Sequence, residues 1–179
     1  MKATGIVRRI DDLGRVVIPK EIRRTMRIRE GDPLEIYTSR DGEVIFKKYS
    51  LLGGVEDFAG QLCETMSRST GSICAVTDRD TVIAVAGGGK RELMGKRITS
   101  ELERIMESRQ IYQYSGEGQA IPVSDSSDKL VTNVAAPILS EGDLLGLVLF
   151  IGSTPTVPGD AEYKLAQTIA AFLGRHMEA

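Results

Sequence analysis

Short apolar runs separated by turn residues fill the first fifty positions of the chain. Val16-Val17-Ile18 is β-branched throughout and too short for a helix, so it predicts a strand. Pro19 suits the first helical position, and Ile22 and Met26 form one apolar stripe after it, so a helix is expected over Pro19–Ile28. The expected strands are Gly5–Ile10, Arg15–Ile18, Pro33–Thr38 and Glu43–Lys48, with turns at Asp11–Gly14 and Ser39–Gly42.

Longer amphipathic segments follow from residue 56 onward. The pattern predicts helices over Glu56–Arg68, from the glycines Gly87–Gly89 to about Arg109, and over Asp160–Met177. It predicts strands over Ser72–Thr77, Thr81–Ala86, Ile111–Tyr114, Leu130–Leu139 and Leu144–Ile151, and a polar loop over Gly116–Lys129. In the last helix, Asp160 is expected to cap the start, and Leu165, Ile169, Phe172 and Leu173 are expected to face the core. Helices against an antiparallel sheet make this an α+β chain.

The pattern breaks at Ser50–Gly54, which indicates two domains. We expect a first domain over residues 1–50, a linker over 51–55 and a second domain over 56–179. Leu51 and Leu52 leave open whether the linker packs on a domain. A unit as short as the first buries little apolar surface against its conformational entropy. Unless the rest of the chain covers it, we expect it to be an obligate dimer.

Composition and charge exclude some function classes. The chain has no apolar run of about 18 residues, so no membrane span is expected. Its start shows no apolar signal core, and two cysteines suit a reducing cytosol. Residues 1–50 hold 12 Lys and Arg against 8 Asp and Glu, whereas the remainder holds 11 against 17. This asymmetry favours an anionic partner for the first domain alone.

Catalytic and cofactor motifs are missing from the sequence. Arg91 follows Gly89-Lys90 where a P-loop needs Ser or Thr, and Glu92 breaks the dinucleotide-binding pattern. His176 is the only histidine, so it forms neither a multi-histidine metal site nor an evident catalytic triad. We therefore expect no enzyme activity, no metal and no cofactor.

Four arginines of the first domain remain as candidate binding residues: Arg8, Arg15, Arg23 and Arg24. One alternative is that they are solvated charges beside acids such as Asp12 and Glu21. A dimer, however, would double them onto one two-fold surface, which matches the pseudo-symmetry of duplex DNA. Aromatic residues are scarce in this segment, which favours double-stranded DNA over single strands.

The residues from Lys2 to Pro19, with Ile22-Arg23-Arg24-Thr25 after them, resemble the AbrB-type transition-state regulators of spore-forming bacteria. This resemblance implies a swapped-hairpin β-barrel, in which two chains interleave their strands into one DNA-binding dimer. It also implies that Arg8, Arg15, Arg23 and Arg24 face the DNA.

The end of the chain resembles a GAF domain, an α/β sandwich with an antiparallel sheet, on Ala136–Leu139, Leu145–Phe150 and the terminal helix. An AbrB-type head with a GAF-like tail is similar to regulators of late sporulation genes in the forespore. This implies activation and repression of transcription, a homotetramer joined through the GAF-like domains, and a cytoplasmic, nucleoid-associated location. No cyclic-nucleotide signature is present, so a small-molecule effector stays an open and unidentified partner.

An antitoxin that neutralises a toxin is the rival hypothesis, because antitoxins also use swapped-hairpin heads. It predicts a disordered toxin-binding tail, whereas residues 56–179 have the pattern of a folded domain.

Overall fold

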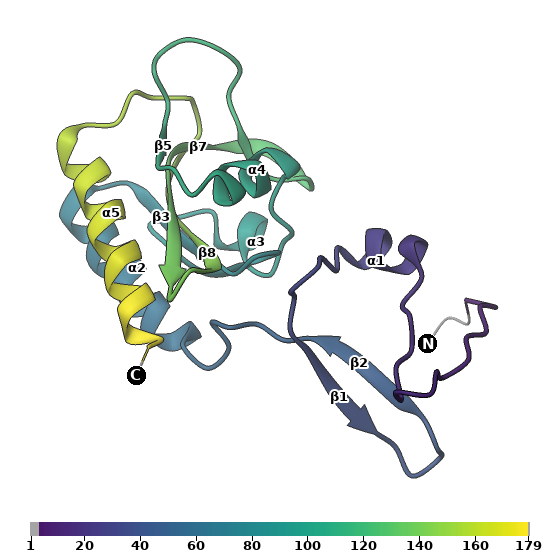
Figure 1. The fold of residues 1–179 in the computed structure, drawn as a ribbon. Coiled ribbons are helices and arrows are strands. Elements are labelled where there is room, and N and C mark those ends of the chain that lie inside the picture. The colour runs from purple at the N-terminus through teal and green to yellow at the C-terminus, as the bar shows by residue number, and fades with distance from the viewer. Residues whose placement is uncertain (1–3, 179) are drawn as a thin grey trace. The chain divides into compact units, whose positions relative to one another are not determined.

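The chain divides into two compact units between Tyr49 and Ser50 in a computed structural model that describes residues 4–178. The first unit holds helix α1 (Lys20–Met26) and the antiparallel strands β1 (Leu34–Thr38) and β2 (Val44–Lys48) (Figure 1). Leu34 pairs with Lys48 and Thr38 with Val44, so Ser39–Gly42 forms the expected hairpin turn. The predicted helix and this hairpin are confirmed.

Residues 4–18 contain no strand, so the strands predicted over Gly5–Ile10 and Arg15–Ile18 are wrong for the single chain. A strand needs a neighbour that accepts and donates its backbone hydrogen bonds, and the single chain provides none for this segment. The intervening turn does form, because the Gly14 N–H donates to the Asp11 carbonyl at 3.0 Å. Pro19 caps α1 in an extended conformation, with ψ 147°, and the helix begins at Lys20.

The second unit combines one sheet with four helices. The helices are α2 (Glu56–Thr70), α3 (Lys90–Leu93), α4 (Ser100–Ser108) and α5 (Asp160–His176). The strands are β3 (Ile73–Thr77), β4 (Val82–Ala86), β5 (Tyr112–Gln113), β6 (Pro122–Ser124), β7 (Ser127–Ser140) and β8 (Asp143–Gly152). The strand order is β4-β3-β8-β7-β5, with β6 paired to β7, and every pair is antiparallel.

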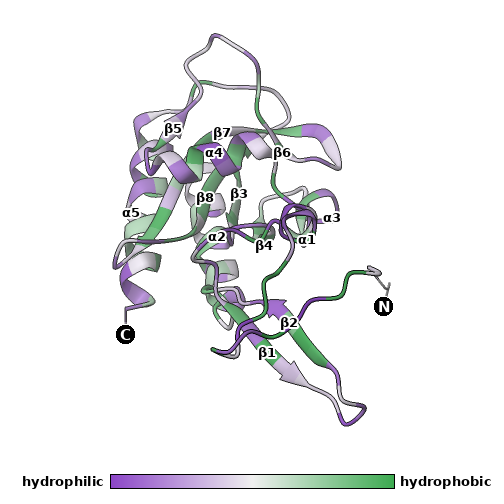
Figure 2. Cartoon of the chain, turned by 45° about the vertical axis from the view of Figure 1, so that its right-hand side comes forward, coloured by the Kyte–Doolittle hydropathy of each residue, from purple (hydrophilic) through white to green (hydrophobic). Residues whose placement is uncertain are grey.

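Helices cover both faces of this sheet. In Figure 1, α2 and α5 lie side by side on one face, and α3 and α4 lie on the other. One apolar core, which includes Cys63, Val148 and Phe150, lies under α2 and α5. A second core, which includes Leu93, Leu102 and Leu149, lies under α3 and α4. Figure 2 shows the matching concentration of hydrophobic residues along β3, β4 and β8.

Leu52 is fully buried in the first of these cores, and Leu51 and Val55 pack against it. The segment assigned above to a linker therefore contributes side chains to the second unit.

Two sequence predictions for the second unit need correction. The helix expected up to Arg109 is two helices, because residues 94–97 dock on the strand β4 instead. The Val82 N–H donates to the Lys96 carbonyl at 2.9 Å, and the Gly95 N–H donates to the Val82 carbonyl at 2.9 Å. The polar loop expected over Gly116–Lys129 contains β6 and the start of β7.

The predicted buried face of α5 is confirmed for Leu173, which lies in the core, and for Leu165 and Ile169, which pack against it, but it is wrong for Phe172. Asp160 lies in the first turn and makes no side-chain cap, and Gly159 occupies the cap position. Phe172 is 47% exposed, whereas the small residues Ala166, Ala170 and Gly174 are buried together with Leu173. The reason is the close approach of α5 to β7: a Cβ at Gly174 would lie 1.9 Å from the Leu139 carbonyl oxygen. Small residues at these positions permit this approach.

Gly174→Ala is therefore expected to destabilise the second unit by about 1–3 kcal/mol, since the added methyl meets rigid backbone. Gly60→Ala, also inside a helix, is the matched control because its Cβ would meet no atom within 4 Å. It should stabilise the unit by about 0.5–1 kcal/mol through the unfolded chain. Urea unfolding followed by circular dichroism measures both, and equal effects would contradict the backbone-contact argument.

Candidate nucleic-acid interface

Helix α1 carries two of the candidate arginines. The helix ends at Met26, and Arg27 after it adopts a left-handed conformation with φ 52°. Its N–H donates to the Arg24 carbonyl at 3.3 Å, while the Arg23 Nε donates to the Ile18 carbonyl at 3.2 Å. Arg23 and Arg24 are both exposed. The short helix thus presents two adjacent guanidinium groups, one of which is held by the backbone that precedes the helix.

A tight turn positions Arg15. The Asp11 Oδ1 accepts hydrogen bonds from the Leu13 N–H at 3.0 Å and from the Arg15 N–H at 2.8 Å. Its Oδ2 accepts from the Arg15 Nε at 2.8 Å. Chiefly the Arg15 N–H, aided by the Arg15 guanidinium, holds the pKa of Asp11 below its ordinary value. Only Nε takes part in this contact, and the Arg15 side chain stays 69% exposed.

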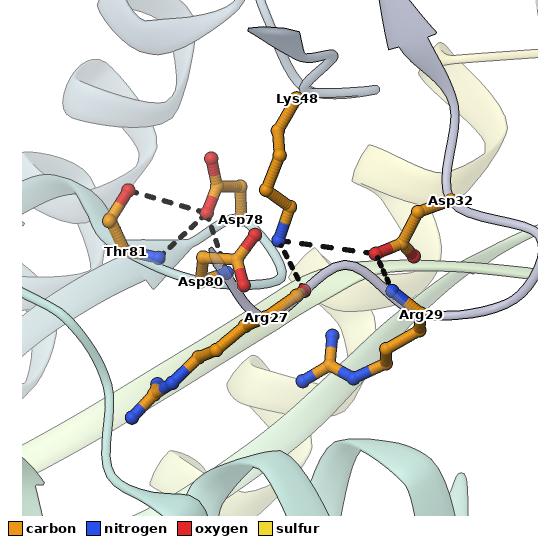
Figure 3. A network of polar contacts seen from close by, with 7 residues as sticks. All are labelled: Arg27, Arg29, Asp32, Lys48, Asp78, Asp80 and Thr81. Carbon is orange, nitrogen blue, oxygen red and sulfur yellow. Dashed lines mark hydrogen bonds and ion pairs between the residues drawn. The ribbon is translucent and has the colours of Figure 1, made fainter. Parts of the chain in front are cut away.

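A polar network joins the end of α1 to the hairpin (Figure 3). The Lys48 Nζ donates to the Arg27 carbonyl at 2.9 Å and lies 4.0 Å from the Asp32 Oδ2. The same Oδ2 accepts a hydrogen bond from the Arg29 N–H at 2.8 Å. Lys48 ends β2, so these contacts fix α1 and its arginines to the hairpin rather than leaving the helix on a free loop.

The first unit has almost no interior of its own. Pro19 is its only buried residue among residues 4–49. Twelve large apolar side chains of this unit are exposed: Ile6, Val7, Ile10, Leu13, Val16, Val17, Met26, Ile36, Tyr37, Val44, Phe46 and Tyr49. Several of them, with Ile18, Ile22 and Ile28, line an open groove of about 440 Å³. Apolar surface of this extent marks an interaction site.

All four predicted arginines lie on the first unit. Two of them flank the turn at residues 11–14, and the other two lie on helix α1. Arg8 belongs to the extended segment before the turn and lines the apolar groove. Arg15 follows the turn, and Arg23 and Arg24 share α1. Asp11, which positions Arg15, was not among the residues predicted from the sequence. The signal was present: an Asp three residues before Gly14 is typical of a side-chain-capped turn.

The described residues of the second unit provide neither a metal site nor a reactive thiol. Among the described residues, no group of three or more His, Cys, Asp and Glu side chains could hold a metal. Burial raises the pKa of Cys63 and of Cys74 to about 12, so both thiols stay protonated and unreactive near neutral pH. No helix within residues 4–178 has the length and apolarity to cross a membrane.

An open cavity of about 630 Å³ lies beside β6 and the start of α4. Its lining includes Thr99, Glu101, Ser124 and Asp128. The buried hydroxyls are already bonded, since the Thr99 Oγ1 donates to the Pro122 carbonyl at 3.0 Å and the Ser124 Oγ pairs with the Ser126 Oγ at 2.9 Å. The lining therefore leaves no buried polar group that would specify a ligand.

Comparisons with known proteins agree with this division of chemistry. Stage V sporulation protein T of Bacillus subtilis (strain 168) is 47% identical over 178 residues, which cover 99% of each chain. The transition state regulatory protein AbrB of the same organism is 63% identical over 49 residues, 27% of this chain and 50% of that protein. The resemblance of the first unit to AbrB-type regulators is thus confirmed.

Among solved structures, the GAF domain of A. aeolicus nlh2 has a TM-score of 0.51 at 14% identity. The match covers 72% of this chain and 88% of that domain, and it shows the GAF fold that the sequence analysis expected. The α+β class is confirmed with it.

Two family profiles cover the chain. Residues 7–50 match a profile described as "Antidote-toxin recognition MazE, bacterial antitoxin". Residues 54–178 match a profile described as "Stage V sporulation protein T C-terminal, transcription factor". The second profile spans more than half of the chain, and the full-length relative carries the same name. The chain therefore belongs to the stage V sporulation protein T family of sporulation transcription factors.

Proposed function

We propose that the chain regulates late sporulation genes, as activator and repressor, by binding duplex DNA through Arg8, Arg15, Arg23 and Arg24. The observation that carries this proposal is the mounting of exposed guanidinium groups on a capped turn and a tethered helix. Arginine in fixed orientation suits both phosphate oxygens and guanine edges. In functional terms, residues 1–50 form the DNA-binding domain, 51–55 the connection and 56–179 the regulatory and oligomerisation domain.

The first unit acts as a dimer in this proposal. Twelve exposed apolar side chains and a groove lined by Val16, Val17 and Phe46 need cover from water. A second copy of the unit has the same short apolar segments, and two-fold exchange would supply the missing neighbours for residues 4–18. The AbrB-like sequence supports a swapped hairpin as the form of this exchange.

The second unit assembles two such dimers into a tetramer through its terminal helices. Phe172 on α5 is 47% exposed, and its ring centroid lies 5.9 Å from that of Phe58 on α2. His176 extends this aromatic group, 4.8 Å from Phe58. An exposed aromatic group on two adjacent helices is typical of a protein interface.

The remaining parts of the proposal concern location and ligands. The protein acts in the cytoplasm of the forespore, associated with the nucleoid, and has no enzymatic activity. Any small-molecule effector of the second unit binds in the open cavity beside β6, whose volume of about 630 Å³ suits such a ligand.

An antitoxin function is the second candidate, because residues 7–50 match the MazE profile. That function requires a tail that folds on a toxin, whereas residues 56–178 already form a sheet with two cores. Co-purification of a nuclease-like partner in stoichiometric amount would favour the antitoxin over the regulator.

Replacing the two arginines of α1 tests DNA binding. Arg23→Ala/Arg24→Ala should weaken binding to selected genomic fragments and flatten the plot of log affinity against log salt, by about 0.9 for each phosphate that is no longer neutralised. Arg40→Ala, an exposed charge in the β1–β2 turn, is the control and should change little. Fluorescence anisotropy over a salt series measures both, and an unchanged double variant would overturn the proposed interface.

The turn that positions Arg15 has its own test. Arg15→Ala removes the guanidinium but keeps the backbone donor, so it should raise the pKa of Asp11 only part of the way to 3.8. Gly14→Ala strains a turn residue with φ 76° and should raise it further. Because the pKa is lowered in the folded state, the stabilisation is lost as pH falls through that lowered value. NMR titration of the Asp11 carboxyl measures this, and an order reversed between the variants would contradict it.

Replacing Phe172 tests tetramer assembly. Phe172→Asp should convert the tetramer into a dimer that still binds one site, because a charge then replaces the exposed ring. Gln167→Asp is the control, since it lies roughly 140° around α5 from Phe172. Analytical ultracentrifugation gives the assembly state. A tetramer that survives Phe172→Asp would exclude this face as the interface.

A further inference from the structure

The second unit is acidic overall, yet it carries one concentrated basic segment. Four of the eleven basic residues in 51–179 fall within eight positions, namely Lys90, Arg91, Lys96 and Arg97. All four are exposed, and Glu92 is the only acid among them. We call residues 90–97 the β4-edge segment. Its charge opposes that of the unit around it, so general solvation of the surface does not explain it.

The backbone of this segment is fixed to the sheet. β4 is an edge strand, and the segment docks on it through the bonds between Val82 and the pair Gly95 and Lys96, each at 2.9 Å. Arg97 forms an isolated bridge with Thr81. Thr81 is held in turn by Asp78, whose Oδ1 accepts from the Thr81 N–H at 2.7 Å (Figure 3). Lys96 and Arg97 therefore project from backbone that is bonded to β4, and Lys90 and Arg91 project from helix α3.

These four charges do not stabilise the fold through ion pairs or side-chain hydrogen bonds with other described residues. Among residues 4–178, no ion pair or side-chain hydrogen bond involves Lys90, Arg91, Lys96 or Arg97, whereas Arg68 elsewhere in the unit lies 3.9 Å from Glu64. A basic segment of this density without internal partners is expected to neutralise an anion outside the chain.

We propose that the β4-edge segment contacts the phosphate backbone of duplex DNA that flanks the site held by the arginines of the first unit. This inference rests on the proposed function, because the first unit would bring the DNA to the second. An extended polyanion fits better than a small ligand, since the cations lie on an exposed edge and not in the open cavity beside β6. Phosphate contacts of this kind add affinity without reading sequence.

The test uses the full chain and duplexes that carry one selected site with flanks of increasing length. The variant Lys90→Ala/Arg91→Ala/Lys96→Ala/Arg97→Ala should bind the shortest duplex as the native chain does. On long duplexes its salt dependence should be shallower, by about 0.9 in log–log slope for each flanking phosphate that it leaves unneutralised. The exchange variant Lys90→Arg/Arg91→Lys should keep native behaviour, because a phosphate contact requires a charge and not a particular side chain.

A control variant with the same change in net charge separates a phosphate contact from a general electrostatic effect. Lys129→Glu lowers the net charge by the same two units as Lys90→Ala/Arg91→Ala, from an exposed position on β7. The proposal expects only the Lys90/Arg91 variant to lose affinity for long duplexes. Equal losses in both, or native behaviour of the fourfold variant on long duplexes, would overturn it. If the native chain bound neither short nor long duplexes, the proposed function would fail as well, and Arg23→Ala/Arg24→Ala would then show no effect.

Discussion

The first unit exposes many apolar side chains to water, and the rest of the structure depends on how these side chains are covered. With one buried residue among residues 4–49, this unit has too little interior to offset the entropy of ordering its backbone. The exposed residues are β-branched and aromatic, such as Val17, Ile36 and Phe46, which favour strands. A second copy is the simplest source of cover. If a second copy covers it, as proposed, dimerisation and folding of this unit are one event, and its exposed arginines form a two-fold set.

Polar contacts orient Arg15, Arg23 and the end of helix α1. These contacts contribute more to geometry than to stability. An exposed ion pair such as Arg15–Asp11 contributes little to stability, because water screens the attraction and two side chains must be ordered to form it. The same pair, however, holds the Arg15 guanidinium through its Nε, while the side chain as a whole stays exposed. The bond from the Lys48 Nζ to the Arg27 carbonyl does the same for the helix, because it ties the end of α1 to the hairpin. Fixed donors lose less entropy when they meet DNA, so modest contacts of this kind improve recognition.

The sequence predicted elements well where the information is local. The hairpin over Leu34–Lys48 and the helix α2 depend on turn residues and on apolar spacing within a few positions. The strands predicted over Gly5–Ile10 and Arg15–Ile18 are wrong for the single chain because a strand needs a paired neighbour, and no other segment of residues 4–49 pairs with them. Phe172 was placed inside for a similar reason. Helical spacing cannot show that Gly174 brings α5 against the Leu139 carbonyl and turns the ring outward. For the site, residue type and density marked the arginines, whereas the role of Asp11 appeared only with its distances.

The opposite charges of the two units fit the proposal that the first unit binds DNA and that the second unit sets how many first units act together. Residues 51–179 carry 17 acidic against 11 basic residues, so outside the β4-edge segment this unit repels DNA and adds little non-specific affinity. In the proposed tetramer, linking two heads through such a unit would make the second binding event intramolecular, which would raise the affinity for paired sites by about 10²–10⁴ without any further base being read. Each head can then bind a single site weakly. Discrimination among genomic positions follows from the spacing of paired sites as much as from the few base edges that four arginines can reach.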